Sequence, residues 1–416
     1  MIKIITASQY SHKRERAVIP PDVSEAVRKI IADVRARGDA ALREYAKKFD
    51  GIELERLEVS EEDFEEASRV VGQRYIEILT KSAENIRAFH SRQLREGFMF
   101  SPGGGVILGQ RVIPLERVGL YVPGGTASYP SSVLMNAIPA KIAGCAEIVV
   151  ATPRPSAQIM AAAKIAGVTR MFRIGGAQAI AALAYGTETV PKVDKITGPG
   201  NVYVAEAKRQ VYGDAGIDMI AGPSEILIIA DKNNFASHIA ADMLAQAEHD
   251  KDATAILITN SRRVANSVSR EIELQIEGLE RRGIAREAID KNGAIIIVRS
   301  INDAVSIANE IAPEHLEICV DEPFEMMTKI RNAGSIFIGR NSPEALGDYY
   351  AGPNHVLPTM GTARFSSPLS VDDFVKKSQF IYYPAGKLFE ASKDIEDFAK
   401  SEGLTAHARS ISIRRE

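Results

Sequence analysis

The sequence contains no tryptophan and only two cysteines among its 416 residues. Cys145 and Cys319 each stand inside an apolar run. We therefore expect two buried core thiols in a reducing compartment. This pattern argues against a disulfide framework and against a zinc site built from cysteines.

Long apolar runs and an excess of one charge are also missing. No run reaches the roughly 18 apolar residues of a membrane span, and residues 1–6 (MIKIIT) lack the apolar core of a signal peptide. We therefore expect a cytoplasmic protein. The 51 Lys and Arg residues nearly balance the 54 Asp and Glu residues, with no long basic run, so nucleic acid is not expected as the main partner.

The sequence does contain a repeated alternation of strand-like and helix-like segments, which favours parallel sheets covered by helices. Residues 23–49 and 60–93 have helical periodicity, and the tail after residue 371 is polar, helical and too short to hold its own core. Strands are expected at 117–122, 147–152, 170–174, 195–196, 226–230, 253–258, 294–298, 316–320 and 335–338. Helices are expected between them at 131–143, 157–166, 177–185, 202–212 and 235–249.

Four glycine-rich turns stand where a strand should pass into a helix, at residues 122–125, 174–178, 198–201 and 221–224. Ligands bind at the carboxyl ends of parallel strands, and glycine lets a pyrophosphate approach the backbone. Gln178 and Asn201 can add hydrogen bonds to a ribose or an amide. The alternative is that these are only tight turns, because no strict Gly-x-Gly-x-x-Gly stands at such a junction.

An amide and an imidazole interrupt an apolar helical stripe at Gln246 and His249, which share a side with Ile239 and Met243. Buried polar groups need partners, and a metal ion is one of them. With the carboxylate of Asp348, these side chains form a mixed nitrogen and oxygen set that suits Zn²⁺. The alternative for Asp348 is an Asx turn or helix cap.

Glu314 and His315 adjoin between a helical stretch and a strand. Histidine titrates near neutral pH and suits a general base, while a neighbouring carboxylate can activate water. A surface loop with an incidental acid and imidazole is the alternative, and His407 on its own is typical of a tail histidine.

Seven motifs then occur in an order that resembles the histidinol dehydrogenase family from about residue 20 to 410. They are RVGLYVPGG (117–125), FRIGGAQAIAALAYGT (172–187), GPGN (198–201), AGPSE (221–225), QAEH (246–249), APEHLE (312–317) and AGPNHVLPT (351–359). The resemblance implies two NAD-dependent oxidations of L-histidinol, through an aldehyde, to L-histidine by a homodimer with one zinc ion per subunit.

The resemblance also implies a role for each matching residue. Zinc ligation falls to Gln246, His249, Asp348 and, from the partner subunit, His407. The cofactor contacts are Tyr121, Gln178 and Asn201, the acid–base pair is Glu314 and His315, and the substrate contacts add Ser224, His355 and Glu402 to His315 and the four zinc ligands. The family pattern leads us to expect glycine where this chain has Met360 and Pro368.

The implied fold is α/β, with two incomplete Rossmann-like domains of mostly parallel sheets and small N- and C-terminal helical pieces. We expect an arm at 1–20 and a first Rossmann-like domain at 21–110 with 225–370, which holds the catalytic and metal residues. A second, NAD-binding domain is expected at 111–224, and a tail at 371–416 that reaches the partner subunit's site. Two other functions stay open: a related enzyme for another polar alcohol, and a non-catalytic metal-binding or assembly protein.

Overall fold

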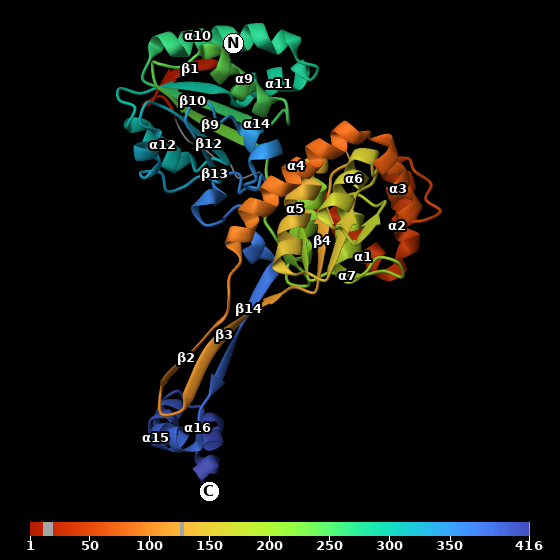
Figure 1. The fold of residues 1–416 in the computed structure, drawn as a ribbon, viewed down its shortest axis with the longest axis vertical. Coiled ribbons are helices and arrows are strands. Elements are labelled where there is room, and N and C mark those ends of the chain that lie inside the picture. Colours follow the sequence, from red (N-terminus) through yellow and green to blue (C-terminus); the bar gives the residue numbers. More distant parts are fainter. Residues whose placement is uncertain (11–19, 125–128, 416) are drawn as a thin grey trace. The chain divides into compact units, whose positions relative to one another are not determined.

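The computed structural model describes residues 1–10, 20–124 and 129–415. The chain divides into two compact units, one of Met1–Gln93 with Leu115–Phe374 and one of Leu94–Pro114 with Val375–Glu416 (Figure 1). Two parallel sheets with helices on both faces make up the first unit, as the alternating sequence pattern predicted. None of the described helices combines the length and apolar character needed to cross a lipid bilayer.

The larger sheet has six parallel strands in the order β1-β11-β10-β9-β12-β13. Alternate side chains of β9 enter two different cores: Ile228 faces α9, α10 and α11, and Leu227 faces α12. Figure 1 shows α9–α11 together on one side of this sheet. The elements are β1 (Lys3–Thr6), β9 (Glu225–Ala230), α9 (Ala236–Ala247), β10 (Thr254–Thr259), α10 (Arg262–Gln275), α11 (Arg282–Asn292), β11 (Ala294–Ile297), α12 (Asp303–Ile311), β12 (His315–Cys319), α13 (Pro323–Met327) and β13 (Ser335–Ile338).

The smaller sheet has five parallel strands in the order β6-β5-β4-β7-β8. Val149 of β5 packs on the face that α1, α7 and α8 cover, and Val150 packs on the face of α4, α5 and α6. The elements are β4 (Arg117–Tyr121), α5 (Pro130–Ala143), β5 (Glu147–Ala151), α6 (Ala157–Ala166), β6 (Arg170–Phe172), α7 (Gly176–Tyr185), β7 (Lys195–Thr197), α8 (Val202–Val211) and β8 (Gly216–Ile217).

The N-terminal helices do not pack in the domain that the sequence assigned to them. The expected first domain joined residues 21–110 to 225–370, around the six-stranded sheet. Val27 and Val34 of α1 and Ile86 of α4 are buried against the five-stranded sheet instead. Helical periodicity shows which face of a helix is buried but not which sheet buries it. These helices are α1 (Pro21–Arg37), α2 (Asp39–Tyr45), α3 (Glu61–Val70) and α4 (Gln73–His90), and Gly38 and Gly72 interrupt the two longer helices that the sequence predicted.

The N-terminal arm was expected over residues 1–20, but its first part is a strand. β1 pairs in parallel with β11 at the edge of the six-stranded sheet, and residues 11–19 lie outside the described residues. The apolar side chains of Ile2 and Ile4 explain the pairing, since Ile2 is buried in the core beside α10 and α11. Cys145 and Cys319 are both free and buried, as predicted.

The second unit contains an antiparallel sheet in the order β14-β3-β2, followed by two helices. The sequence predicted only helix after residue 371, so β14 corrects that expectation. β14 pairs along its whole length with β3, from Val375 opposite Pro114 to Tyr382 opposite Ile107. The elements are β2 (Phe98–Gly103), β3 (Val106–Pro114), β14 (Val375–Tyr382), α15 (Ala385–Ser401) and α16 (Thr405–Ser412).

Candidate active site

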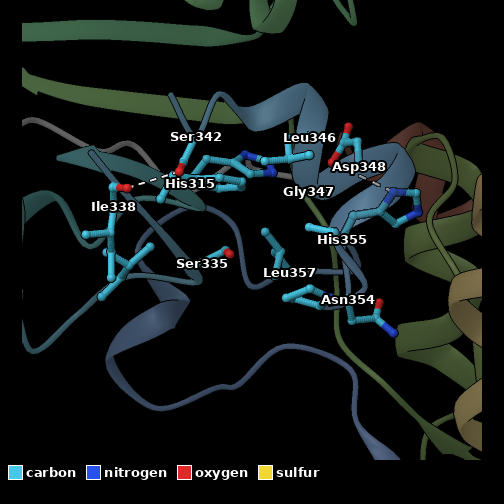
Figure 2. A pocket seen from close by; sticks show the side chains of 14 residues that line it. His315, Ser335, Ile338, Ser342, Leu346, Gly347, Asp348, Asn354, His355 and Leu357 are labelled. Carbon is cyan, nitrogen blue, oxygen red and sulfur yellow. Dashed lines mark hydrogen bonds and ion pairs between the residues drawn. The ribbon is translucent and has the colours of Figure 1, made fainter. Parts of the chain in front are cut away.

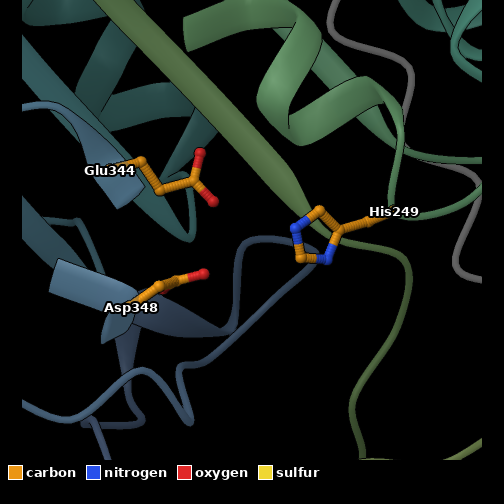
Figure 3. A group of neighbouring side chains, drawn as sticks. All are labelled: His249, Glu344 and Asp348. Atoms are coloured by element: carbon orange, nitrogen blue, oxygen red, sulfur yellow. The ribbon is translucent and has the colours of Figure 1, made fainter. Parts of the chain in front are cut away.

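Three side chains from two parts of the first unit form a cluster that could hold a metal ion. One ligand atom from each of His249, Glu344 and Asp348 lies within 4.8 Å of the others, and Figure 3 shows the three side chains around a common space. His249 follows the end of α9, while Glu344 begins α14 (Glu344–Leu346) and Asp348 lies in the next turn, η4 (Gly347–Ala351). Residues four apart in a helical segment share a side, which brings the two carboxylates together.

Gln246 lies next to this cluster and is fully buried on α9. With its amide oriented to satisfy the surrounding network, its nitrogen donates to Glu344 Oε2 at 2.8 Å. Its oxygen lies 2.8 Å from the backbone nitrogen of Glu225, whose single N–H it shares with Glu314 Oε2. His249 and Asp348 thus lie in one cluster, Gln246 contacts that cluster through Glu344, and Glu344 was not in the predicted set.

The electrostatics of the cluster suit a divalent cation. Burial, and then the neighbouring carboxylates of Asp348 and Glu314, raise the pKa of Glu344 well above its usual range. Carboxylate and imidazole groups are ordinary ligands of zinc, and a cation at this position would offset the repulsion among the acids. The donor set therefore fits the predicted zinc ion.

The predicted acid–base pair is buried at the start of β12. The backbone N–H of Glu225 donates to Glu314 Oε2 at 2.8 Å, and burial raises the pKa of Glu314 well above its usual range. His315 Nδ1 lies 3.0 Å from the carbonyl oxygen of Glu225, to which it donates. Burial lowers the pKa of His315 to about 4, so the imidazole is neutral near pH 7.

The other nitrogen of His315 is available for chemistry. Among the described residues, Nε2 of His315 has no hydrogen-bond partner, although Glu344 Oε1 lies 3.8 Å away. Since Nδ1 carries the proton, Nε2 presents a lone pair. An unpaired acceptor in a buried position is costly unless a ligand uses it.

A cavity of about 230 Å³ lies beside His315. It is lined by His315, Asp348 and His355 among others, and Figure 2 shows these three around it. His355 Nδ1 lies 3.8 Å from Asp348 Oδ1, and burial lowers the pKa of His355. Two of the predicted substrate contacts therefore lie on the same cavity as the predicted base.

The predicted cofactor residues lie at or just after the carboxyl ends of β4, β6 and β7 in the five-stranded sheet. Tyr121 ends β4, and its hydroxyl accepts from the backbone N–H of Gly176 at 3.0 Å. Gln178 is buried in the first turn of α7, and Asn201 caps α8 by accepting from the N–H groups of Tyr203 and Val204. Of the first glycine-rich turn, Gly125 lies outside the described residues.

Ser224 and Met360 belong to loops that meet beside β9. The backbone N–H of Gly222 donates to Thr359 Oγ1 at 2.7 Å, and that of Met360 donates to Glu225 Oε1 at 3.2 Å. Met360 has a φ of 54°, a left-handed conformation that glycine adopts without cost. This explains why glycine was expected there. Pro368 stands just before Leu369, whose N–H donates to Val356 O at 2.9 Å.

Glu402 and His407 belong to the second unit, where Glu402 ends α15 and His407 lies on α16. Both side chains are exposed within that unit. Their predicted roles, like those of the other predicted site residues, stay predictions.

The sequence reasoning missed Glu344 and the structural role of Glu225. A signal for Glu344 was present, since Pro343-Glu344 begins a helical turn four residues before Asp348. Glu225 acts through its backbone N–H and carbonyl groups, to which Glu314 and His315 bind. Backbone roles leave no mark on residue type, so no sequence pattern could have indicated this one.

The chain is an α/β protein with two parallel sheets, each covered by helices on both faces. Its buried neutral imidazole and the cluster that could hold a metal ion together form an enzyme-like site. The sequence model of the family described as Histidinol dehydrogenase matches residues 13–415. Histidinol dehydrogenase of Bacillus anthracis is 55% identical over 406 residues, covering 96% of this chain and 95% of the relative. That of Geobacter sulfurreducens is 54% identical over 400 residues, covering 94% and 93%.

A solved structure gives the same result. The crystal structure of histidinol dehydrogenase from Elizabethkingia anophelis superimposes with a TM-score of 0.91 at 36% identity, covering 99% of this chain and 98% of that one. The chain belongs to the histidinol dehydrogenase family.

Proposed function

We propose that this chain is a zinc-requiring enzyme that oxidises L-histidinol to L-histidine with NAD, in two steps through the aldehyde. Membership of the family supports the reaction. The single observation that carries the proposal is the unpartnered Nε2 of His315, beside a cavity and 3.8 Å from a carboxylate of the metal-type cluster.

His315 is the proposed general base of the first oxidation. Its Nδ1–H is committed to the Glu225 carbonyl, so Nε2 alone can take the proton from the substrate hydroxyl. The neutral imidazole that burial favours is the form that can accept a proton. NAD would accept the hydride of the first step, and a second NAD molecule, bound after the first NADH has left, would accept the hydride of the second step.

Glu314 is the proposed residue that activates water for the second step. Its Oε2 is held by the N–H of Glu225, which leaves the rest of the carboxyl group to accept a proton as water attacks the aldehyde. Carrying out both oxidations in one site keeps the reactive aldehyde from release.

The zinc ion would be held by His249 and Asp348, with Gln246 as a predicted ligand from α9 and Glu344 within the same cluster. When bound, it supplies a fixed charge that orients the imidazole and amine of the substrate. Ser224 and His355 are proposed to contact the substrate from the surrounding loops.

The NAD site is proposed at Tyr121, Gln178 and Asn201. Support comes from their places at the carboxyl ends of β4, β6 and β7, where doubly wound sheets bind nucleotides. The N-termini of α7 and α8 favour the negative pyrophosphate at the same edge. We also propose a cytoplasmic location, which fits the two buried free thiols.

A homodimer with shared sites completes the proposal, with Glu402 and His407 reaching the site of the other copy. The second unit exposes large apolar side chains, which a partner copy would cover. They include Met99, Phe100, Ile381, Tyr382, Phe389 and Phe398. Mixing a His407→Ala variant with a Gln246→Ala variant should restore part of the activity in mixed dimers, and absence of recovery in verified mixed dimers would exclude sharing.

A related enzyme for another polar alcohol is the competing proposal. The two are separated by measuring NADH formation from histidinol and from a panel of other amino alcohols and polar alcohols under the same conditions. A kcat/KM for histidinol at least about a hundredfold above the rest supports the proposal, because a site built to pair polar groups discriminates strongly. Preference for another alcohol would replace it.

A further inference from the structure

A buried ion pair contacts the predicted cofactor turn, and neither of its residues lines the catalytic cavity. Lys208 on α8 forms an ion pair with Asp218, and their side chains are only 2% and 1% exposed. Lys208 Nζ also donates to the carbonyl oxygen of Gly198 at 3.0 Å. The backbone N–H of Gly198 donates to Asp218 Oδ2 at 2.8 Å.

We infer that Lys208 and Asp218 are positioning residues that hold the turn 198–201 in the shape that receives the dinucleotide. This inference rests on the proposed NAD site. The two side chains hold both backbone hydrogen-bonding groups of Gly198, one from the helix that follows the turn and one from the end of β8.

Stability alone gives little reason for such a pair. Removing two charges from water is costly, and apolar side chains of similar volume often stabilise a fold equally well. Hydrogen bonds from two charged side chains to one glycine are directional, so they fix the orientation of that peptide backbone, which apolar contacts do not. We therefore assign the pair to holding the backbone of Gly198 in place.

The turn has little tolerance for displacement. Gly198 has a φ of 110°, and a Cβ atom there would lie 2.1 Å from the carbonyl oxygen of Tyr121. The Tyr121 hydroxyl in turn accepts from the N–H of Gly176. A shift of Gly198 would therefore reach the predicted cofactor residue on β4 and the glycine turn at the start of α7.

The substrate cavity offers an internal reference for this inference. The residues that line it include neither Lys208 nor Asp218 nor any residue of the turn 198–201. Loss of positioning should therefore raise the KM for NAD and leave the KM for histidinol unchanged.

The test uses the full-length enzyme and three variants: Lys208→Met, the double variant Lys208→Met/Asp218→Asn, and Arg209→Met as a matched control. The double variant removes both charges, so it leaves no buried ion unpaired, and the asparagine oxygen can still accept from Gly198. Arg209 neighbours Lys208 on α8 and pairs with buried Glu206. Within the described ranges, no hydrogen bond or ion pair joins Arg209 to the turn.

We expect the KM for NAD, and the Kd for NAD measured by titration without substrate, to rise on the order of tenfold in both Lys208 variants. The KM for histidinol and the kcat at saturating NAD should stay within about threefold, and Arg209→Met should behave like the parent. If Lys208→Met fails to fold, the double variant alone decides.

An unchanged Kd for NAD in a folded double variant would overturn the positioning role, and so would an equal rise with Arg209→Met. Equal losses for both substrates would likewise overturn it, since they would indicate a purely structural role. If the parent enzyme reduces NAD with histidinol and the variants have the same Kd for NAD, only this inference is refuted. If the parent enzyme does not bind NAD, the proposed function is refuted as well.

Discussion

His315 Nδ1 lies 3.0 Å from the carbonyl oxygen of Glu225, one strand away in the six-stranded sheet. This contact fixes which nitrogen of the imidazole bears the proton and leaves the other with its lone pair. Glu225 also holds Glu314 through its N–H group. One backbone position on β9 thus orients both members of the proposed acid–base pair.

Replacing His315 with asparagine should lower the rate of the first oxidation on the order of a hundredfold or more, because the group proposed to take the hydroxyl proton is lost. Single-turnover formation of NADH from histidinol measures this step. His238→Asn is the control, since His238 is exposed on α9. A near-normal rate for the His315 variant would refute its role.

Replacing Glu314 with glutamine should spare the first hydride transfer more than the second. The amide can still accept from the Glu225 N–H, so the local structure is kept, but it cannot take a proton from water. Rapid mixing with histidinol and then with histidinal separates the two transfers. Equal losses in both would contradict the proposed division of labour.

Replacing Glu344 with glutamine should weaken zinc retention while the protein stays folded. The cluster loses one carboxylate, and the contact from Gln246 loses its charged acceptor. Zinc content after dialysis against a graded chelator measures the effect. The exposed Glu310→Gln is the control, and parent-like retention by the Glu344 variant would remove Glu344 from the metal site.

Much of the first unit could be predicted from the sequence, because its strands are short apolar runs bounded by turn residues. β9, for example, is buried throughout and stands where it was expected. β14 could not be found in this way. Its side chains are mostly exposed and include Lys376 and Lys377, and its partner β3 lies more than 250 residues earlier in the chain.

The sequence prediction named two residues of the cluster, His249 and Asp348, because their side-chain types suit a metal ion, and their role as zinc ligands stays a prediction. The site prediction missed Glu225, whose role depends on the position of its backbone and not on its side chain. It also missed Glu344, a common residue type whose role comes from its neighbours. Family resemblance supplied the expectation of glycine at residue 360, and the backbone there supplies the reason.

The left-handed backbone at Met360 allows a test of that reason. The free energy of unfolding should be about 1 kcal/mol higher for Met360→Gly than for Met360→Ala, so the glycine variant should unfold at a higher urea concentration. Both variants lose the long side chain, and only alanine keeps a Cβ at a φ of 54°. Urea unfolding of the two variants gives the difference directly. Equal stability, or a more stable alanine variant, would show that the segment changes conformation.

The most direct test of the proposed chemistry is the yield of NADH per histidinol consumed, measured with the purified enzyme before and after chelation and again after zinc is restored. We expect two NADH per histidinol, loss of the reaction with the chelator and recovery with zinc. A yield of one, or a reaction that a verified metal-free protein still carries out, would contradict a metal-dependent site that completes both oxidations.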